Sequence, residues 1–318
     1  MTKIDLSVVI PVYRSKETLR PLTELLLKVL DSEGLSYEVV FVDDGSPDDS
    51  WAVLEAIQAE FPHCVIAIQL MRNYGQHNAL MCGFRHSRGQ LVITIDDDLQ
   101  NPPEEIPKLI NAIKTRNLDI VYGSYESTKK HSGWRNLGST LIITFYNLVF
   151  QNNIRGSSFR IIRRELLDSI FSYDLNFTFV DGLLAWNTKR IGEVPVSHHP
   201  RQSGRSGYNP IKLLTLAFNL FTNFSLLPLQ LVSLTGFVFS ICGFIAACTY
   251  AILYITQRIT VPGYASTIIT VLVMGGIQLL SLGILGEYLG RLHLNVNRKP
   301  QYIERIVLAA SAPSSEVT

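Results

Sequence analysis

The sequence predicts a mixed α/β fold, with a mostly parallel sheet covered by helices on both faces and followed by a membrane anchor. Apolar runs typical of buried strands alternate with segments whose apolar residues recur at helical spacing. The composition then changes, because residues 213–257 and 259–286 contain no Asp, Glu, Lys, Arg or His. A helix of about 20 apolar residues crosses a bilayer. We therefore expect a soluble domain joined to two membrane spans.

Five apolar runs are predicted as strands of the sheet, and they are 6–12, 38–42, 65–70, 91–95 and 119–122. Helices are expected between them at 16–30, at 76–86 and at 103–115, with another that begins at Ser46. Ser46 is a suitable cap for that helix, and Pro47 suits its first turn. Such alternation is typical of parallel sheets.

Carboxylates follow two of the predicted strands, Asp43-Asp44 after 38–42 and Asp96-Asp97-Asp98 after 91–95. Ligands of parallel sheets bind at the carboxyl ends of strands. Three adjacent carboxylates repel one another, so a fold that clusters them usually holds a cation. Oxygen ligands suit Mg²⁺ or Mn²⁺, and such an ion often neutralises a phosphate. Neither site has a Gly-x-Gly-x-x-Gly fingerprint, which argues against a dinucleotide enzyme.

The second half of the chain is predicted to associate with a membrane. Residues 209–228 are expected to form an interfacial helix, and 229–290 to contain spans near 229–255 and 266–288. The loop between the spans carries one charge, Arg258, whereas basic residues flank their outer ends. The positive-inside rule then places the large domain and the tail 291–318 in the cytoplasm. We expect an integral protein of the cytoplasmic (inner) membrane.

Composition limits the remaining possibilities. The net charge of +1 gives no general attraction to nucleic acid. The charged start is followed by too short an apolar stretch for a signal peptide.

Four cysteines, at 64, 82, 242 and 248, lack metal-binding spacing and are expected to be reduced packing residues. Small residues such as Gly275, Gly276 and Gly283 would allow close helix packing in a homo-oligomer.

Three motifs occur in order, at 7–13 (SVVIPVY), 42–46 (VDDGS) and 96–104 (DDDLQNPPE). Together they resemble family 2 glycosyltransferases of GT-A fold. With the anchor, the chain resembles more narrowly the polyprenyl-phosphate glycosyltransferases, which include dolichol-phosphate mannose synthases and bactoprenol (undecaprenyl-phosphate) glucosyltransferases. The resemblance implies a GT-A, Rossmann-like domain at 1–208, ahead of the interfacial helix, the anchor and the tail.

The resemblance also implies roles for residues at the strand ends. Asp96, Asp98 and Gln100 would hold Mg²⁺ or Mn²⁺, and Asp97 would lie near the donor sugar, so that Asp97 and Asp98 are catalytic candidates. The alternative is an acidic turn that caps the next helix. Asp43 or Asp44 would accept the uracil N3–H, and the sequence leaves both open. The other donor-binding candidates are Pro11, Tyr13 and Arg72.

A second set of residues is expected to bind the acceptor, a lipid phosphate, because arginine matches phosphate geometry. The candidates are Arg135 and Ser139, which match a family pair, and Arg201 and Arg205, in a Gly- and Ser-rich loop. Attraction to anionic headgroups is the alternative for Arg201 and Arg205. Lys129 or Lys130 would stand in for an arginine that many members carry before Tyr125.

One departure from the family concerns a base. Many members have Gly-Asp-Phe-Arg where this chain has Ser157-Ser158-Phe159-Arg160, so a carboxylate sometimes suggested as a base is absent. A phosphate monoester has its second pKa near about 6, so the nucleophile is already ionised at neutral pH. It needs positioning more than deprotonation. Arg160 is then the catalytic candidate that would orient phosphate.

These observations and the resemblance predict a metal-dependent transfer of a hexose to a polyprenyl phosphate on the cytoplasmic membrane face, and the resemblance implies that the transfer is inverting. The expected donor is UDP-glucose. The alternatives are GDP-mannose or UDP-amino-arabinose as donor, or a non-catalytic protein that binds a sugar nucleotide and partners a flippase. A processive polysaccharide synthase would need a Gln-x-x-Arg-Trp motif and more spans, and the sequence has neither.

Overall fold

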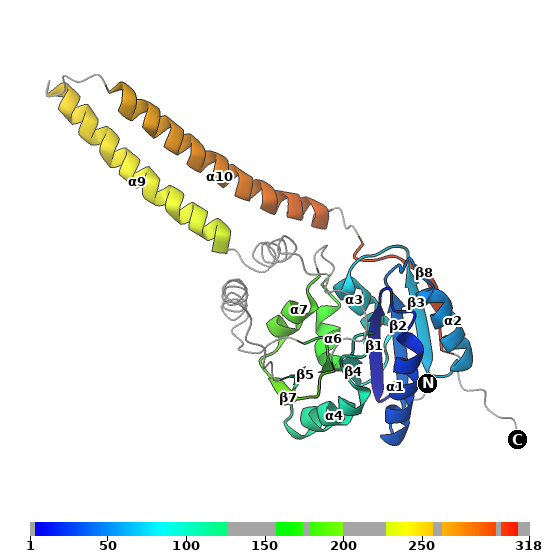
Figure 1. The fold of residues 1–318 in the computed structure, drawn as a ribbon. Helices are drawn as coiled ribbons and strands as arrows, with labels where there is room; N and C mark the ends of the chain where they lie inside the picture. Colours follow the sequence, from blue (N-terminus) through cyan, green and yellow to red (C-terminus); the bar gives the residue numbers. More distant parts are fainter. Residues whose placement is uncertain are drawn as a thin grey trace, which may run out of the picture. The chain divides into compact units, whose positions relative to one another are not determined.

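The computed structural model describes residues 4–125, 157–173, 178–199, 227–256, 263–296 and 300–310 (Figure 1). The chain divides into two compact units. The first comprises Met1–Gly207 and Lys299–Thr318, and the second comprises Tyr208–Arg298. The first unit contains the predicted soluble domain, and the second contains the predicted spans.

An eight-stranded sheet forms the centre of the first unit, in the order β7-β5-β6-β4-β1-β2-β3-β8. The strands are β1 (Leu6–Val12), β2 (Tyr37–Asp43), β3 (Val65–Leu70), β4 (Leu91–Thr94), β5 (Ile120–Ser124), β6 (Arg160–Arg163), β7 (Ile191–Pro195) and β8 (Glu304–Leu308). Strands β1 to β4 are parallel to one another, and β7 is parallel to β5. Strands β6 and β8 are antiparallel to their neighbours. The mostly parallel sheet is thereby confirmed.

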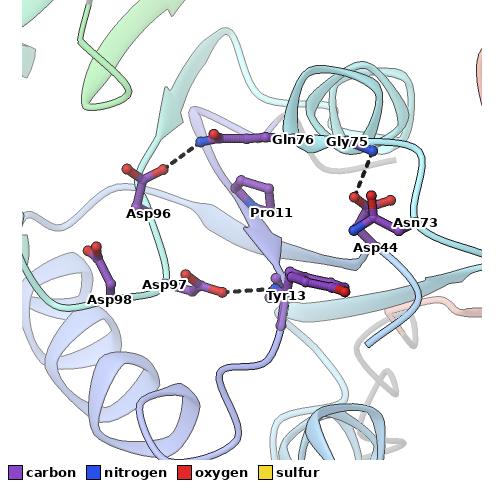
Figure 2. A pocket seen from close by; sticks show the side chains of 10 residues that line it. Pro11, Tyr13, Asp44, Asn73, Gly75, Gln76, Asp96, Asp97 and Asp98 are labelled. Carbon is purple, nitrogen blue, oxygen red and sulfur yellow. Dashed lines mark hydrogen bonds between the residues drawn. The ribbon is translucent and has the colours of Figure 1, made fainter. Parts of the chain in front are cut away.

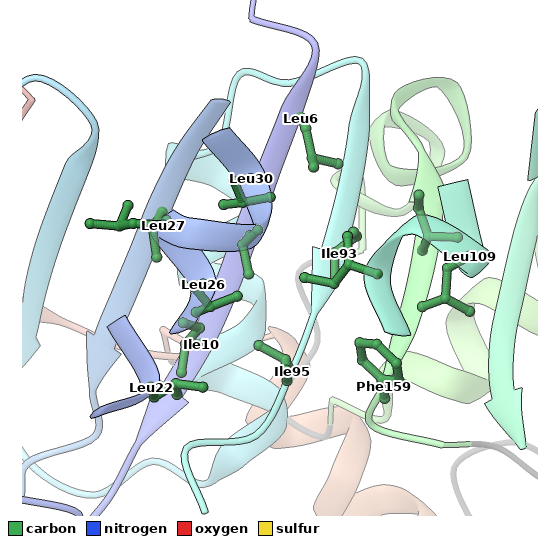
Figure 3. Packing of buried hydrophobic residues seen from close by; sticks show 14 of the residues in the cluster. Leu6, Ile10, Leu22, Leu26, Leu27, Leu30, Ile93, Ile95, Leu109 and Phe159 are labelled. Atoms are coloured by element: carbon green, nitrogen blue, oxygen red, sulfur yellow. The ribbon is translucent and has the colours of Figure 1, made fainter. Parts of the chain in front are cut away.

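Helices cover both faces of the central strands. On one face, Leu22 and Leu26 of α1 (Leu19–Ser32) belong to the same buried cluster as Ile10 of β1 (Figure 3). On the other face lies α3 (Gln76–His86), where a Cβ on Gly83 would come within 2.3 Å of Val9 Cγ1. Because successive residues of β1 face opposite helices, every residue of this strand is buried. A strand with two buried faces is expected to be apolar throughout.

The five predicted strands are found as β1 to β5; β1 and β3 have the predicted ends, and the ends of the others differ by at most two residues. Helices α1 and α3 are also found, and the segment 103–115 forms the 3₁₀ turn Pro103–Glu105 followed by α4 (Ile106–Thr115). Helices α6 (Arg164–Ile170) and α7 (Val180–Asn187) were not predicted.

The predicted start of α2 (Ser50–Glu60) at Ser46 is wrong, because the helix begins four residues later. Ser46 is engaged elsewhere: its N–H donates to Asp43 Oδ1 at 3.1 Å, and its Oγ accepts the N–H of Arg14 at 3.1 Å. Asp48 instead accepts the hydroxyl of Ser50 at 2.6 Å. The Ser-Pro-Asp-Asp segment therefore forms a turn ahead of the helix.

Strand β8 adds the last strand at the β3 edge of the sheet. Its residues pair with Ala67 to Leu70, and the Met71 N–H donates to the Ile303 carbonyl at 2.9 Å. The sequence analysis assigned residues 291–318 to a tail and expected no strand there. The chain thus returns to the first unit after α10 (Tyr264–Val296) and completes its sheet.

The second unit contains α9 (Leu227–Ile255) and α10. Among the described residues, one stretch is long and apolar enough to cross a membrane, Val273–Leu294, and Leu229–Ile245 is a shorter apolar stretch. Large apolar side chains are exposed on both helices, such as Phe244 and Leu279, each 72% exposed. The second span remains a prediction. Most of the predicted interfacial helix at 209–228 lies outside the described residues.

Candidate active site

A cavity of about 290 Å³ lies at the carboxyl ends of β1, β2 and β4 (Figure 2). Its lining combines predicted site residues with neighbours from the start of α3, namely Pro11, Val12, Tyr13, Asp44, Asn73, Gly75, Gln76, Asp96, Asp97 and Asp98. Both predicted carboxylate groups therefore reach one cavity. This is the place where parallel α/β sheets bind their ligands.

Asp97 connects the acidic turn after β4 to the loop after β1. Its Oδ2 accepts the N–H of Tyr13 at 3.0 Å and the hydroxyl of Ser15 at 2.5 Å. Burial raises the pKa of Asp97 to about 6, against the effect of these hydrogen bonds, and the charges of Asp96 and Asp98 add to the increase. The carboxylates of this turn repel one another, and a bound cation would reduce that repulsion.

Asp96 is held by donors from two other elements. Gln76 Nε2, at the start of α3, donates to its Oδ1 at 2.8 Å, and the Ser158 hydroxyl donates to its Oδ2 at 2.5 Å. Ser158 is the residue at the position where the resemblance implies an Asp in many members of that family. The Ser158 hydroxyl donates a hydrogen bond to the acidic turn. An aspartate at this position would instead add a fourth carboxylate beside Asp96, Asp97 and Asp98.

Asp98 and Gln100 lie in the same turn, in which the Gln100 N–H donates to Asp98 Oδ1 at 3.2 Å. Leu99, between them, has a φ of +59°, a left-handed conformation that costs roughly 1–2 kcal/mol for a residue with a side chain. Such strain is often found at functional sites. The carboxylate and amide oxygens of this turn are the ligand type that Mg²⁺ and Mn²⁺ prefer, so the residues present fit a divalent ion.

The structure distinguishes the two aspartates after β2. Asp44 lines the cavity, and its two oxygens accept the N–H groups of Tyr74 at 2.6 Å and Gly75 at 2.8 Å. Asp43 is wholly buried and does not belong to the cavity lining. Burial raises the pKa of both, that of Asp44 to about 6. Asp44 is the one that a ligand in the cavity can reach.

The loop before α3 reaches the cavity through other residues than the predicted Arg72. Asn73 and Gly75 line the cavity, whereas Arg72 does not and lies over the Tyr74 ring, 4.6 Å from its centroid. Pro11 and Tyr13 line the cavity as predicted. Gly75 has a φ of +92°, which favours glycine, and places the first turn of α3 at the cavity.

Replacing Gly45 with alanine is expected to lower stability by about 2–4 kcal/mol, because left-handed backbone and overpacking both cost energy. Gly45 has a φ of +66°, and a Cβ there would lie 2.5 Å from the backbone carbonyl carbon of Arg72. Thermal unfolding measures the effect. Gly34→Ala is the control, since Gly34 has a φ of +64° but no atom within 4 Å of its added Cβ. Equal losses for both variants would contradict the close contact.

Arg160 lies in the core beside the site. Its side chain is 1% exposed and forms an ion pair with Asp181 of α7. The Tyr122 hydroxyl also donates to Asp181, at 3.1 Å. Arg160 does not belong to the cavity lining, whereas Ser158, two residues earlier, reaches Asp96.

The segment before the Gly- and Ser-rich loop lies against the acidic turn. The His199 N–H donates to the Gln100 carbonyl at 2.8 Å. The His198 ring stacks on Tyr125, with 4.2 Å between ring centroids, and burial together with the charges of Asp96 and Asp98 raises the pKa of Tyr125. The loop itself, with Arg201 and Arg205, lies outside the described residues, as do Arg135, Ser139, Lys129 and Lys130.

Comparisons with known proteins identify relatives along almost the whole chain. Residues 7–171 match the family described as Glycosyl transferase family 2. The undecaprenyl-phosphate 4-deoxy-4-formamido-L-arabinose transferase of Edwardsiella ictaluri is 36% identical over 318 residues, covering 98% of this chain and 96% of the relative. The protein of the same name from Pseudomonas paraeruginosa is 38% identical, covering 96% and 92%.

Among solved structures, the chain is similar to glucosyl-3-phosphoglycerate synthase from Mycobacterium tuberculosis in complex with uridine diphosphate. The TM-score is 0.50 at 18% sequence identity, and the match covers 69% of this chain and 78% of the other. At this identity the similarity concerns the fold alone, which is GT-A-like.

Proposed function

The chain belongs to glycosyl transferase family 2 and is a polyprenyl-phosphate sugar transferase, and we propose that it transfers 4-deoxy-4-formamido-L-arabinose from its UDP carrier to undecaprenyl phosphate. The observation that carries this proposal is the identity of 36% and 38% to two transferases of that name over nearly their full lengths. It favours the amino-arabinose donor, which the sequence analysis held as an alternative, over UDP-glucose.

We propose that Asp96, Asp98 and Gln100 hold Mg²⁺ or Mn²⁺. The support is a strained turn in which Asp96 and Asp98 line the cavity, while Gln100 lies in the same turn but outside the lining. When bound, such an ion stabilises the charge that develops on a diphosphate leaving group. Gln76 and Ser158 fix the Asp96 carboxylate, and the Tyr13 N–H and Ser15 hydroxyl fix that of Asp97. The acidic turn is thus positioned before a ligand arrives.

The donor nucleotide is proposed to bind across the ends of β1 and β2. Asp44 is the better of the two candidates for accepting the uracil N3–H, because it lines the cavity. With a pKa of about 6, its carboxyl is mostly ionised at neutral pH and can accept this hydrogen bond. Pro11 and Tyr13 are proposed to flank the base or ribose, and Asn73 and Gly75 to contact the rest of the nucleotide, because all four line the cavity.

We propose that Arg135, Ser139, Arg201 and Arg205 bind the acceptor phosphate, and the structure offers support for the loop that carries Arg201 and Arg205. The support is the position of His198 and His199 against the acidic turn, immediately before the loop that contains Arg201. The phosphate is already ionised near neutral pH, so these groups position it for attack on C1. Arg160, which pairs with Asp181, is proposed to position Ser158 instead of contacting phosphate.

We further propose that α9 and α10 anchor the chain in the cytoplasmic membrane, with the first unit in the cytoplasm. The candidate span Val273–Leu294 and the exposed apolar side chains of both helices support this placement. A polyprenyl phosphate has its headgroup at the membrane surface. An anchored transferase therefore meets its acceptor by diffusion within the membrane.

Donor kinetics test this proposal. The full chain in detergent is assayed with undecaprenyl phosphate and Mg²⁺, using UDP-4-deoxy-4-formamido-L-arabinose, UDP-glucose and GDP-mannose separately. We expect kcat/KM for the formamido-arabinose donor to exceed that for glucose by about 100-fold, the order of discrimination that a few contacts supply. Excess EDTA is expected to abolish transfer. Equal rates with UDP-glucose would contradict the donor assignment, and UDP binding without transfer would favour the flippase partner.

A further inference from the structure

Three potential metal ligands meet on the side of α3 that faces β8. Cys82 and His86 lie one turn apart on the helix, and Glu304 is the first residue of β8. His86 Nε2 lies 2.9 Å from Glu304 Oε1, and Cys82 Sγ lies 3.6 Å from the same oxygen. All three ligand atoms are within 4.8 Å of one another.

These separations suit one tetrahedral ion. Bonds of about 2.0–2.3 Å from Zn²⁺ to oxygen, nitrogen and sulfur place the ligand atoms of a tetrahedron roughly 3.3–3.6 Å apart. The observed distances of 2.9 and 3.6 Å are close to these values. The third separation, between Cys82 Sγ and the His86 ring nitrogen, is at most 4.8 Å, so side-chain adjustments bring the three ligand atoms to tetrahedral spacing.

The ligand types point to zinc and away from the ion proposed for the donor cavity. A thiolate and an imidazole prefer Zn²⁺ over Mg²⁺ or Mn²⁺, which favour oxygen ligands. Cys82 is buried, whereas the side chains of His86 and Glu304 are 29% and 32% exposed. An ion can enter from this exposed side, and water can complete the fourth position.

We propose that Cys82, His86 and Glu304 bind one Zn²⁺ ion that fastens β8 to α3. His86 of α3 and Glu304 of β8 are 218 positions apart in the sequence. The ion would hold the strand that follows α10 onto the sheet and would brace the helix whose first residue, Gln76, contacts Asp96. This inference is independent of the proposed donor and of the cavity ion.

Metal content tests the proposal directly. The full chain, purified in detergent without a polyhistidine tag, is loaded with ZnCl₂, dialysed against zinc-free buffer and measured by inductively coupled plasma mass spectrometry. We expect one zinc per chain in the wild type and in Cys64→Ser, which alters another buried cysteine of the same unit. Cys82→Ser and Glu304→Gln are expected to retain less than about a tenth as much zinc, because each loses a ligand.

A spectroscopic measurement on the wild type keeps the test independent of the folding of any variant. Titration with CoCl₂ is expected to produce a thiolate-to-cobalt charge-transfer band at one equivalent, which added ZnCl₂ removes. Asp98→Asn should keep this band, which separates the site from the donor cavity. Folded wild-type chain that retains no zinc and gives no charge-transfer band would overturn the proposal, whatever the outcome of the transfer assay.

Discussion

Asp98→Asn is expected to reduce sugar transfer by about 100- to 1,000-fold, the usual effect of removing one group that stabilises charge in a transition state. The substitution keeps the size of the side chain and removes one negative charge from the turn that lines the cavity. A proposed ligand of the divalent ion is thereby weakened. Initial rates at saturating Mg²⁺ and donor measure the effect.

The matched control is Asp49→Asn. Asp49 immediately precedes α2, and its exposed carboxylate forms a 3.3 Å surface ion pair with Lys16. Its replacement removes the same charge from the same unit and is expected to change the rate less than about twofold, since surface pairs contribute little. If Asp98→Asn retained activity within a few-fold of the Asp49→Asn variant, the role proposed for the acidic turn would be wrong.

Asp181→Leu is expected to destabilise the chain by about 3–5 kcal/mol, the usual cost of leaving a buried charge without its partner. Arg160 is 1% exposed, and Asp181 both pairs with it and accepts the Tyr122 hydroxyl. Removal of the carboxylate would leave the guanidinium in the core with no counter-charge from α7. The thermal midpoint of unfolding in detergent is expected to fall by roughly 10 °C.

Two further variants show whether the lost stability comes from the broken Arg160–Asp181 ion pair or from altered packing. The double variant Arg160→Met with Asp181→Leu is expected to regain most of the stability, because an apolar replacement of both partners is often neutral. Glu60→Gln, at a surface pair with Arg20, is the control and should cost less than about 1 kcal/mol. A loss in Asp181→Leu no greater than that of the control would contradict the buried-pair assignment.

The central part of the sheet was predictable because its strands are buried on both faces. Strands β1 to β4 are nearly all apolar, so the local pattern is enough to identify them. Strand β6 begins and ends with arginine, and no local pattern marks it. Its charges are satisfied at long range: Arg163 Nε, for example, donates to the Leu118 carbonyl at 2.7 Å. Tertiary pairing, not local composition, makes this segment a strand.

The carboxylates that line the cavity were predictable from the sequence, but their hydrogen-bond partners were not. Strand ends bring Asp44 and the three aspartates of the acidic turn to one place, as expected for a parallel sheet. The partners of Asp96 were missed, since Gln76 and Ser158 come from separate elements and neither has a sequence signal of its own. The directions of Arg72 and Arg160 were also not predictable, because aromatic stacking and a buried ion pair decide them.

The proposed zinc site shows a further limit of sequence reasoning. Two ligands, Cys82 and His86, are four residues apart on a helix, a spacing common without any metal. The third ligand, Glu304, comes from a strand that follows the membrane unit, and only the pairing of β8 with β3 brings it close.

A one-pot competition tests the central claim most directly. The full chain is given undecaprenyl phosphate, Mg²⁺ and equal concentrations of UDP-4-deoxy-4-formamido-L-arabinose and UDP-glucose, and the lipid product is identified by mass spectrometry. The account predicts undecaprenyl phosphate that carries the formamido-pentose as the dominant product in the wild type and its near absence in Asp98→Asn. A glucosylated lipid as the dominant product, or unmodified undecaprenyl phosphate alone, would contradict it.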